Sequence, residues 1–562
     1  MTTIQIAHNA VTAKLIDADR TAKLEVQRVL SYTVDGCEHM DAFQRGGWDG
    51  KSSFLSFTEG TFPRGFVHLV QQHLTKCGYR VQVVKKPYPE PLGPELPEVD
   101  AFGYDPRYDY QPQVMQKLIR HGQIIARVAT GGGKSRIAKL CTARIDRPTL
   151  FLTTRGVLMY QMASSFEDLG EKVTIIGDGE VSLRPTKITC GMVQTIASWL
   201  EEITVDGEMT RQLKLQADKE DREVEKLTTK LKKEKKPTLE VVEAAKALRK
   251  RLERERTPDE ELIKKIESKV ERQTARRREM IKVLATFEFV ILEEAHEVSG
   301  GSFFEILRHC KNAHYRLALT ATPFMKDSEE SNMRLMASSG PIAVVVSEKT
   351  LIDRGILARP YFKFIELKEA PDRLYRSTPW QRAYEVGITT NALRNKHVTA
   401  EAMRAVRYGL PVMVLVQHKA HGKVLCDMMG AAGLKARYIF GEDDQDSRKS
   451  ALLALKTGEI NVLIGSTILD VGVDVPAVGM VILAGGGKAE VANRQRIGRG
   501  LREKKNGMPN VAFIVDFADG FNTHLSGHYR TRRAIVESTP GFAENVVSDF
   551  DYAGLGFVRR AA

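Results

Sequence analysis

The stretch ARVATGGGKSRIAKL, residues 126–140, joins a predicted strand to a predicted helix through three glycines. Residues 123–128 are mostly apolar, as in a short buried strand, and residues 135–141 carry apolar side chains at helical spacing. At such a junction, backbone N–H groups and the helix N-terminus converge on an anion. The stretch therefore predicts a phosphate-binding loop, whose members are Thr130, Gly131, Gly132, Gly133, Lys134 and Ser135.

Lys134 and Ser135 have the chemistry that nucleotide phosphates require. The ammonium of Lys134 would reach the β- and γ-phosphates, and the hydroxyl of Ser135 would bind Mg²⁺. One position departs from the usual phosphate-loop pattern, because Val128 stands where that pattern has its first glycine. From this stretch alone, a flexible glycine-rich turn remains the alternative.

Length and composition bound the class of protein. A chain of 562 residues that is 42% hydrophobic can form roughly three to four domains with sizeable cores. The sequence has no apolar run of the ~18 residues that cross a membrane, and its first residues lack a secretory signal. Six scattered cysteines form no CxxC pair, which predicts reduced thiols in a cytosol, without a disulfide framework or a zinc site.

Positive charge favours a polyanionic partner. The net charge is +13 and the isoelectric point is about 9.2. Residues 211–280 hold 23 Lys and Arg against 16 Asp and Glu, so over half of the excess lies in one segment. The alternative is that these charges only solvate the surface.

The chain divides into segments of different pattern. Residues 1–86 predict a small N-terminal α+β domain, and a proline-rich, semi-rigid linker follows at 87–100. Strand–helix alternation then indicates two α/β domains, at 101–335 and 336–545, ahead of a tail at 546–562. Apolar runs predict parallel strands covered on both faces, at residues 123–128, 149–153, 173–176, 287–292, 316–319, 412–416, 462–464, 481–483 and 511–515.

A charged segment at residues 206–282 interrupts the first α/β domain. It is more than half charged and keeps narrow apolar spacings typical of paired helices, as at Val241, Ala245, Leu248 and Leu252. The pattern predicts an inserted antiparallel helical hairpin, which we expect to assist nucleic-acid binding or to contact a protein partner. A disordered charged tract is the alternative.

Two acids follow another predicted strand. In FEFVILEEAHE, Glu293 and Glu294 come directly after an apolar run. A carboxylate at a strand end can hold Mg²⁺, and its neighbour can orient and deprotonate an attacking water. Two exposed acids in a loop are the alternative.

Further polar motifs come later in the chain. RLALTATP places Thr320 and Thr322 at a strand end, and GSTILDVGVDVP occupies residues 465–476. NRQRIGRGLREKK, residues 493–505, carries cations that could lie along one side of a helix or turn and stabilise charge on a γ-phosphate. A basic solvated helix is the alternative for this last motif.

Taken in order, these motifs resemble those of superfamily 2 helicases and translocases. The set ATGGGKS, EEAH, LTATP, STILDVGVDVP and QRIGRGLR falls within residues 105–520. The resemblance implies an α/β fold with two RecA-like parallel-sheet domains in tandem, to which the N-terminal domain and the hairpin are additions. It also implies ATP and Mg²⁺ as cofactors. Val128 is compatible with it, because many members of the family lack the first loop glycine.

The resemblance assigns nucleotide chemistry by matching position. It implies that Gln111 reads adenine, that Asp474 meets the ribose and that Arg502 is an arginine finger with Arg499 beside it. Glu293, implied to bind Mg²⁺ with Ser135, stands where the family usually has aspartate. The implied catalytic set is Lys134, Glu293, Glu294, His296, Gln495, Arg499 and Arg502.

Other matching positions imply contacts with nucleic acid. Thr320 and Thr322 would couple the nucleotide site to strand binding. The implied contacts to the nucleic-acid backbone are Thr154, Arg155, Gln194, Thr195, Ser466 and Thr467.

The N-terminal segment narrows the resemblance. GGWDGKSSFLSF and FPRGFVHLVQQHLTKCGYRVQVV resemble the DNA-binding region of phage UvsW-type helicases and their XPB-like relatives. In that case Trp48 could stack on bases and Lys51 could neutralise phosphate. The alternative is that Trp48 belongs to the core.

The expected activity is that of an ATP-dependent DNA helicase or translocase acting on branched or duplex DNA in recombination, repair or replication restart. An RNA helicase and a restriction-type translocase that does not unwind DNA are alternatives. A non-catalytic nucleic-acid-binding scaffold is an alternative of another class. The expected location is the cytoplasm, that of a bacterial host if a phage encodes the chain.

Overall fold

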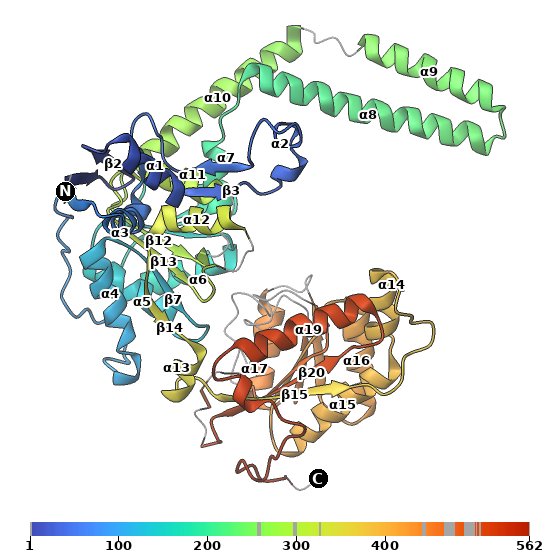
Figure 1. Cartoon of the computed structure of the whole chain (residues 1–562). Coiled ribbons are helices and arrows are strands. Elements are labelled where there is room, and N and C mark those ends of the chain that lie inside the picture. The colour runs from blue at the N-terminus through green and yellow to red at the C-terminus, as the bar shows by residue number, and fades with distance from the viewer. Residues whose placement is uncertain are drawn as a thin grey trace.

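In the computed structural model, the phosphate-loop stretch connects β7 (Gln123–Val128) to α5 (Lys134–Ile145) in the first α/β domain (Figure 1). The structure describes residues 3–255, 260–295, 301–324, 328–440, 445–465, 478–487, 501, 503–504 and 507–560.

The first α/β domain has an eight-stranded sheet in which only the edge strand β10 is antiparallel to its neighbour. Most of its strands are apolar throughout, because helices cover both faces of a parallel sheet. In spatial order they are β10 (Glu180–Val181), β9 (Val173–Gly177), β11 (Ile188–Met192), β8 (Thr149–Thr153), β12 (Phe289–Glu293), β13 (Tyr315–Thr320), β7 (Gln123–Val128) and β14 (Ile342–Val346).

Two apolar clusters divide the helices of this domain between the faces of the sheet. Alternate side chains of each strand enter opposite clusters, as Ile124 and Ile125 do. One face is covered by α4 (Tyr110–His121), α5 (Lys134–Ile145) and α6 (Gly156–Glu167). The other is covered by α7 (Val193–Leu200), α11 (Gly301–His309) and part of α12 (Glu329–Ser339).

The second α/β domain has six parallel strands. In spatial order they are β15 (Arg359–Glu366), β20 (Val511–Ala518), β19 (Met480–Leu483), β16 (Val412–Leu415), β18 (Val462–Gly465) and β17 (Ala436–Ile439). Helices α15 (Ala392–Arg407) and α16 (Lys419–Ala431) cover one face, and α17 (Gln445–Thr457) and α19 (Thr523–Ser538) pack on the other. The two RecA-like parallel-sheet domains confirm the predicted fold class.

A four-stranded sheet forms the core of the N-terminal domain, in the order β5 (Thr61–Pro63), β2 (Thr12–Ile16), β1 (Thr3–His8) and β6 (Arg80–Lys85). Helices α1 (Arg20–Val29) and α3 (Val67–Lys76) pack on it. A small hairpin of β3 (Ser31–Thr33) and β4 (Lys51–Ser53) carries α2 (Asp41–Gln44) in its loop.

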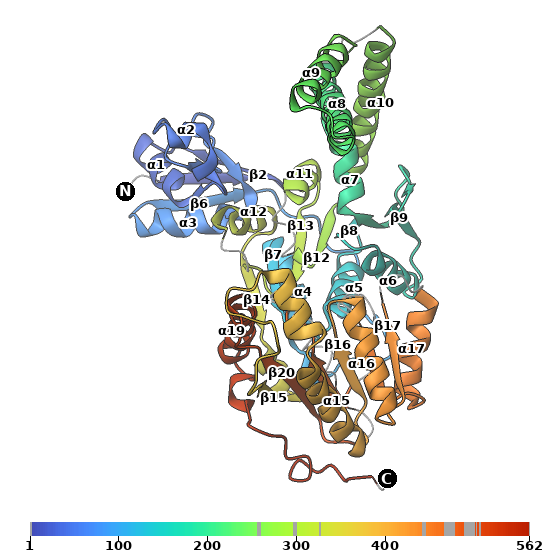
Figure 2. The same cartoon turned by 90° about the vertical axis from the view of Figure 1, so that its right-hand side faces the viewer.

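The N-terminal domain is docked on the first α/β domain, beside α12 (Figure 2). A β-carbon on Gly65 would lie 2.1 Å from the carbonyl oxygen of Met336, so the two backbones meet directly. The guanidinium of Arg64 donates to the carbonyl of His314 at 2.9 Å, and Ala337 enters the N-terminal core. These contacts fasten the two domains together.

The proline-rich segment has neither helix nor strand, as its composition predicts, but it is docked on the first α/β domain. The hydroxyl of Tyr315 donates to Pro89 at 2.6 Å, and Arg144 donates to the carbonyl of Gly93 at 2.6 Å. A β-carbon on Gly93 would lie 1.8 Å from the carbonyl oxygen of Ala143. The segment therefore follows the surface of the domain.

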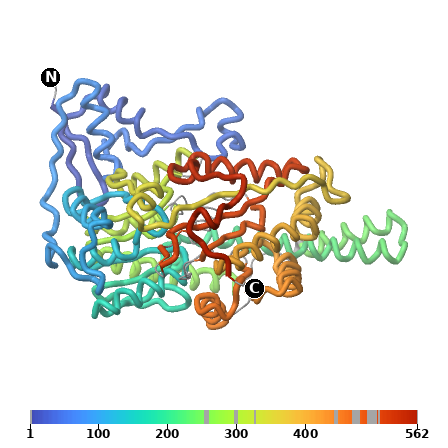
Figure 3. Tube along the Cα trace, turned by 90° about the horizontal axis from the view of Figure 1, so that it is seen from below, coloured from blue at the N-terminus to red at the C-terminus, as the bar shows by residue number. Residues whose placement is uncertain are grey.

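The charged segment is a long helical arm that projects from the body (Figures 1 and 3). It consists of α8 (Val205–Lys233), α9 (Thr238–Glu255) and α10 (Glu260–Leu284), so its return limb is two helices. The end of α10 belongs to the first α/β domain, because Met280, Val283 and Leu284 lie in its core. The predicted hairpin boundary at residue 282 therefore falls inside a core helix.

Candidate nucleotide and nucleic-acid site

The phosphate loop connects β7 to α5 through backbone that only glycine adopts readily. Gly131 has φ +87° and Gly133, the N-cap of α5, has φ +76°. A β-carbon on Gly132 would lie 2.6 Å from the side chain of Val128. Val128 is fully buried beneath the loop, so the residue that departs from the usual pattern is part of the support of the loop.

The segment that links the two α/β domains covers this loop. A β-carbon on Gly131 would lie 2.7 Å from Leu357, and one on Gly132 would lie 3.3 Å from Leu351. Both leucines are buried, and Leu351 belongs to α13 (Glu348–Asp353). Movement of the loop would therefore reach the interdomain segment directly.

Gln111 contacts the phosphate loop from α4. Its amide Nε2 donates to the carbonyl of Gly132 at 3.4 Å, and its Oε1 accepts from Arg136 at 2.7 Å. Tyr110 donates to the same carbonyl at 2.8 Å, and Asp100 pairs with Arg136 at 2.8 Å. The sequence predicted that Gln111 reads adenine, but it did not identify Arg136 and Asp100. Arg136, in α5, contacts Gln111 in α4 and Asp100 in the segment before α4.

Lys134 forms an ion pair with Glu294. Lys134 Nζ lies 3.1 Å from Glu294 Oε1, and the two side chains are only 12% and 13% exposed. Burial alone would lower the pKa of Lys134, but the carboxylates of Glu294 and Glu293 outweigh it and the pKa is raised. Glu294 also has φ +49°, a conformation that non-glycine residues seldom adopt and that is found at functional sites.

Glu293 ends β12 as a buried carboxyl group. Burial raises its pKa to about 8, the ammonium of Lys134 opposes this shift, and Glu294 adds to it. Among the described residues, its buried Oε2 has no hydrogen-bond partner. A buried oxygen of this kind, with the Ser135 hydroxyl in the first turn of α5, fits the oxygen donors that Mg²⁺ prefers.

The predicted coupling residues lie on the next strand. Thr320 ends β13 and is fully buried, and its hydroxyl accepts the backbone N–H of Thr322 at 3.1 Å. In the ladder between β12 and β13, Glu293 pairs with Leu319. The two threonines therefore lie next to the acidic pair.

The predicted nucleic-acid contacts of the first α/β domain also lie together. Thr154 and Arg155 follow β8, and Gln194 and Thr195 lie in the first turn of α7, which follows β11. These two strands are neighbours, and Gln194 Nε2 donates to the carbonyl of Thr154 at 3.1 Å. Arg155 and Thr195 are half-buried and Gln194 is exposed.

Apart from Gln111, which lies in α4, these predicted site residues lie at or shortly after the carboxyl ends of five adjacent parallel strands, β11, β8, β12, β13 and β7. Parallel strands bring the loops at their carboxyl ends to one edge of a sheet, which is where α/β domains bind ligands. The candidate nucleotide site and the candidate nucleic-acid contacts therefore share this edge.

Trp48 lies apart from this edge, in the loop of the β3–β4 hairpin. Its indole N–H donates to the carbonyl of Lys51 at 2.7 Å, and the ring is half-buried. It belongs to none of the apolar clusters in the described part of the chain. Lys51 is exposed.

Several predicted site residues lie outside the described residues, most of them in the second α/β domain. They are His296, Ser466, Thr467, Asp474, Gln495, Arg499 and Arg502.

Comparison with known proteins gives two family matches in this order along the chain. The model for the type III restriction enzyme res subunit matches residues 105–325, and that for the helicase conserved C-terminal domain matches residues 396–504. Together they include every motif described above from the phosphate loop to QRIGRGLR. None of the described helices combines the length and apolarity that crossing a membrane requires.

Individual relatives share low but extended identity. The ATP-dependent DNA helicase uvsW of Enterobacteria phage T4 is 24% identical over 237 residues, covering 42% of this chain and 46% of the relative. The DNA 3'-5' translocase XPB2 of Sulfurisphaera tokodaii is 23% identical, covering 39% and 56%. The crystal structure of T4 UvsW aligns with a TM-score of 0.41 at 16% identity, over 97% of this chain and 98% of that one. In the two sequence alignments, the chain spans about half the length of the curated relatives that it matches.

Proposed function

We propose that this chain, which belongs to the superfamily 2 helicases and is related to the UvsW and XPB proteins, hydrolyses ATP to translocate along DNA and unwind it. One observation carries the proposal. The Lys134–Glu294 pair, the buried Glu293 and the Gln194–Thr154 contact all lie at or shortly after the carboxyl ends of strands of the same sheet. ATP chemistry and strand binding would therefore occur side by side.

For hydrolysis, Lys134 would exchange Glu294 for the β- and γ-phosphates. The released Glu294 carboxylate would then orient the attacking water and accept its proton. Glu293 and Ser135 would hold Mg²⁺, which when bound neutralises phosphate charge. His296, Asp474, Gln495, Arg499 and Arg502 complete the proposed nucleotide set.

Coupling to movement follows from the packing of the phosphate loop. Leu351 and Leu357 of the interdomain segment lie against Gly132 and Gly131, so a change in the loop on nucleotide binding would shift the second α/β domain. Thr320 and Thr322, beside the acidic pair, would transmit the same change toward the nucleic-acid contacts. Alternate closing and opening of the two domains would move the bound strand stepwise.

The proposed DNA surface begins at Thr154, Arg155, Gln194 and Thr195, with Ser466 and Thr467 from the second α/β domain. Its extension is the root of the helical arm, where α10 packs along α7 and Gln273 donates to the carbonyl of Ser198 at 2.8 Å. Residues 269–278 carry five basic side chains and one acid, whereas α8 and α9 are nearly balanced in charge.

Three basic side chains at the root, Arg272, Arg276 and Arg278, are exposed and so available to phosphate. Arg276 also lies over the ring of Trp199, 5.4 Å from its centroid. The distal part of the arm, residues 215–262, is the proposed contact for a protein partner. Trp48 and Lys51, on the N-terminal hairpin, are proposed to contact the DNA beyond the motor domains.

The proposed substrate is branched or duplex DNA, in recombination, repair or replication restart. It rests on the activities for which two relatives are named, a DNA helicase and a DNA translocase. Relatives also include RNA helicases of pre-mRNA splicing, and one family model describes a restriction enzyme subunit. RNA unwinding and translocation without unwinding are therefore the alternatives within enzymes, and a non-catalytic scaffold is the alternative of another class.

The test is ATP turnover by the full chain with single-stranded, duplex, forked and four-way DNA, and with RNA. Stimulation by DNA together with strand separation of the forked or four-way substrate is the expected result. Stimulation by RNA alone would indicate an RNA helicase, and stimulation without strand separation would indicate a translocase. Nucleic-acid binding without ATP turnover would refute the enzymatic proposal.

A further inference from the structure

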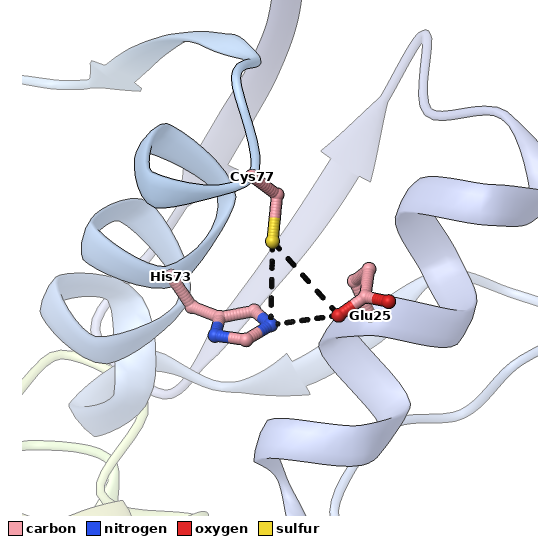
Figure 4. A group of neighbouring side chains, drawn as sticks. All are labelled: Glu25, His73 and Cys77. Atoms are coloured by element: carbon pink, nitrogen blue, oxygen red, sulfur yellow. Dashed lines mark hydrogen bonds and ion pairs between the residues drawn. The ribbon is translucent and has the colours of Figure 1, made fainter.

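The N-terminal domain carries a cluster of three side chains that are all common metal ligands (Figure 4). Glu25 lies in α1, His73 in the last turn of α3, and Cys77 at the end of α3. Glu25 Oε2 is 3.0 Å from His73 Nε2, and Cys77 Sγ is 3.7 Å from that nitrogen and 3.9 Å from that oxygen. Carboxylate, imidazole and thiol therefore converge on one point outside the nucleotide site.

The backbone holds these side chains in place. Cys77 N–H donates to the carbonyl of His73 at 3.0 Å, so the two residues keep the i, i+4 spacing that places side chains on one face of a helix. Helix α1 packs against α3 through the buried side chains of Val26 and Val70 in the N-terminal core. Arg28 Nη1 lies 3.3 Å from the other carboxylate oxygen of Glu25, Oε1, and also donates to Oε2 at 3.5 Å. Such an outer contact is the kind that orients a metal ligand.

The spacing of the three ligand atoms can be compared with a tetrahedral zinc site. Zn–S, Zn–N and Zn–O bonds of about 2.3, 2.05 and 2.0 Å put S and N about 3.6 Å apart, S and O about 3.5 Å apart, and N and O about 3.3 Å apart. The observed separations of 3.7, 3.9 and 3.0 Å lie within about 0.4 Å of these values. A hydrogen bond between Glu25 and His73 explains only the shortest of the three separations. It does not explain why the sulfur of Cys77 lies near the same nitrogen.

We propose that Glu25, His73 and Cys77 bind one zinc ion that fastens α1 to α3, with a fourth position open to water. The ion replaces the thiol proton of Cys77, and that proton passes to solvent. His73 binds the ion through Nε2. Of the six cysteines, Cys77 is the exposed one, and exposed thiolates are the ones that metals reach. The absence of CxxC does not exclude such a site, because its ligands come from two helices and Glu25 is 48 residues from His73.

The test uses Co²⁺ as the spectroscopic probe on the full chain, after treatment with a chelator. One Co²⁺ is expected to bind per chain and to give a thiolate-to-cobalt charge-transfer band, which Zn²⁺ then abolishes by displacement. Cys77→Ser removes the band, and Cys77→Ser and His73→Gln each weaken binding by more than the ~10–100-fold typical of outer contacts. The matched control is Cys426→Ser, a half-exposed cysteine outside the cluster, which keeps both the band and the affinity.

A second measurement guards against unfolded variants. Zn²⁺ is expected to raise the Tm of the wild-type chain and of Cys426→Ser but not that of Cys77→Ser, while ATP turnover is unchanged in all three. Co²⁺ bound without a thiolate band would overturn the proposal by placing the ion elsewhere, for example on the acids beside the phosphate loop. A Cys77→Ser chain that binds as tightly as the wild type would overturn it as well.

Discussion

The carboxyl edge of the first sheet and the helical arm are built from the same kinds of charged residue, in very different surroundings. At the edge, Lys134 and Glu294 pair with side chains 12% and 13% exposed. In the arm, Arg249 and Asp221 pair with side chains 57% and 64% exposed. Because water screens exposed pairs, only the buried pair should have large energetic consequences. The arm has the higher density of charge, but the buried pair lies at the proposed reactive site.

Lys134→Ala should have the largest effect of the variants considered, with ATP hydrolysis abolished while the fold is kept. The ammonium would balance phosphate charge in the transition state, and loss of such a group costs at least about 10²–10³-fold in rate. Steady-state ATP turnover measures the loss, with circular dichroism as the check on folding. The matched control is Lys139→Ala, because Lys139 lies on the same helix and donates to the carbonyl of Val99. Near-normal turnover by a folded Lys134→Ala chain would remove the phosphate-loop assignment.

Glu294→Gln should bind ATP but hydrolyse it about 10²–10⁴-fold more slowly, because the amide cannot accept a proton. Glu293→Gln should instead raise the Mg²⁺ concentration that ATP turnover requires, since it removes the carboxylate proposed to hold the ion. Single-turnover hydrolysis and nucleotide binding, each measured across Mg²⁺ concentrations, separate the two effects. If Glu293→Gln were the slow variant that retains ATP and Glu294→Gln were active, the two roles would be exchanged.

Local sequence predicted the parts of this edge that depend on local pattern. The apolar runs that became β8, β9, β12 and β13 are continuous, and the glycines at 131 and 133 occupy the junction that requires positive φ. Five strands of the two large sheets were not predicted: β10, β11, β14, β15 and β17. The pairing of neighbouring strands, not their sequence, decides that these segments are strands.

Contacts between distant segments were beyond the reach of spacing arguments. Arg136 with Asp100, and Glu25 with His73, join residues 36 and 48 positions apart. The division of the arm was also missed, because net charge over residues 206–282 does not reveal that half of its positive excess lies in α10, which packs beside α7. Only packing shows which part of a charged helix faces a core.

Variants of Arg272, Arg276 and Arg278 distinguish the root of the arm from its distal part. Replacing all three by Gln should flatten the salt dependence of DNA binding, because each arginine that neutralises a phosphate of duplex DNA contributes ~0.9 to the slope of log K against log salt. Replacing residues 215–262 by a short Gly/Ser turn should leave both the slope and basal ATP turnover unchanged. That deletion keeps Glu208, Lys269 and the core end of α10. A flatter slope after the deletion alone would move the DNA contact to the distal arm.

Glu208 is the buried exception in the arm, and it should make the root pH-sensitive. The hydrogen bond from Lys269 is the main cause that lowers its pKa from 4.5 to about 2. A lowered carboxyl pKa stabilises the folded root above about pH 4.5, and that stabilisation is lost as the pH falls toward 2. Glu208→Gln should therefore lower local stability by about 1–2 kcal/mol at pH 7, after allowance for the exposed lysine. Hydrogen exchange of α8 at pH 7 measures this, and an unchanged exchange rate would contradict it.

The smallest effect is expected for Arg249 and Asp221, which join α9 to α8. Their contact is as short as 2.6 Å, yet both side chains are more than half exposed. Coupling of such pairs is about 0.2–1 kcal/mol and falls with added salt, because the Debye length shrinks from about 10 Å at 0.1 M to about 3 Å at 1 M. A double-mutant cycle of Arg249→Ala and Asp221→Ala, followed by thermal unfolding at both salt concentrations, measures that coupling. ATP turnover should be unaffected in all three variants. A coupling that exceeded 1 kcal/mol and persisted in high salt would show that burial does not distinguish the ion pairs of the two regions. Any loss of turnover would show that the distal arm contributes to ATP hydrolysis.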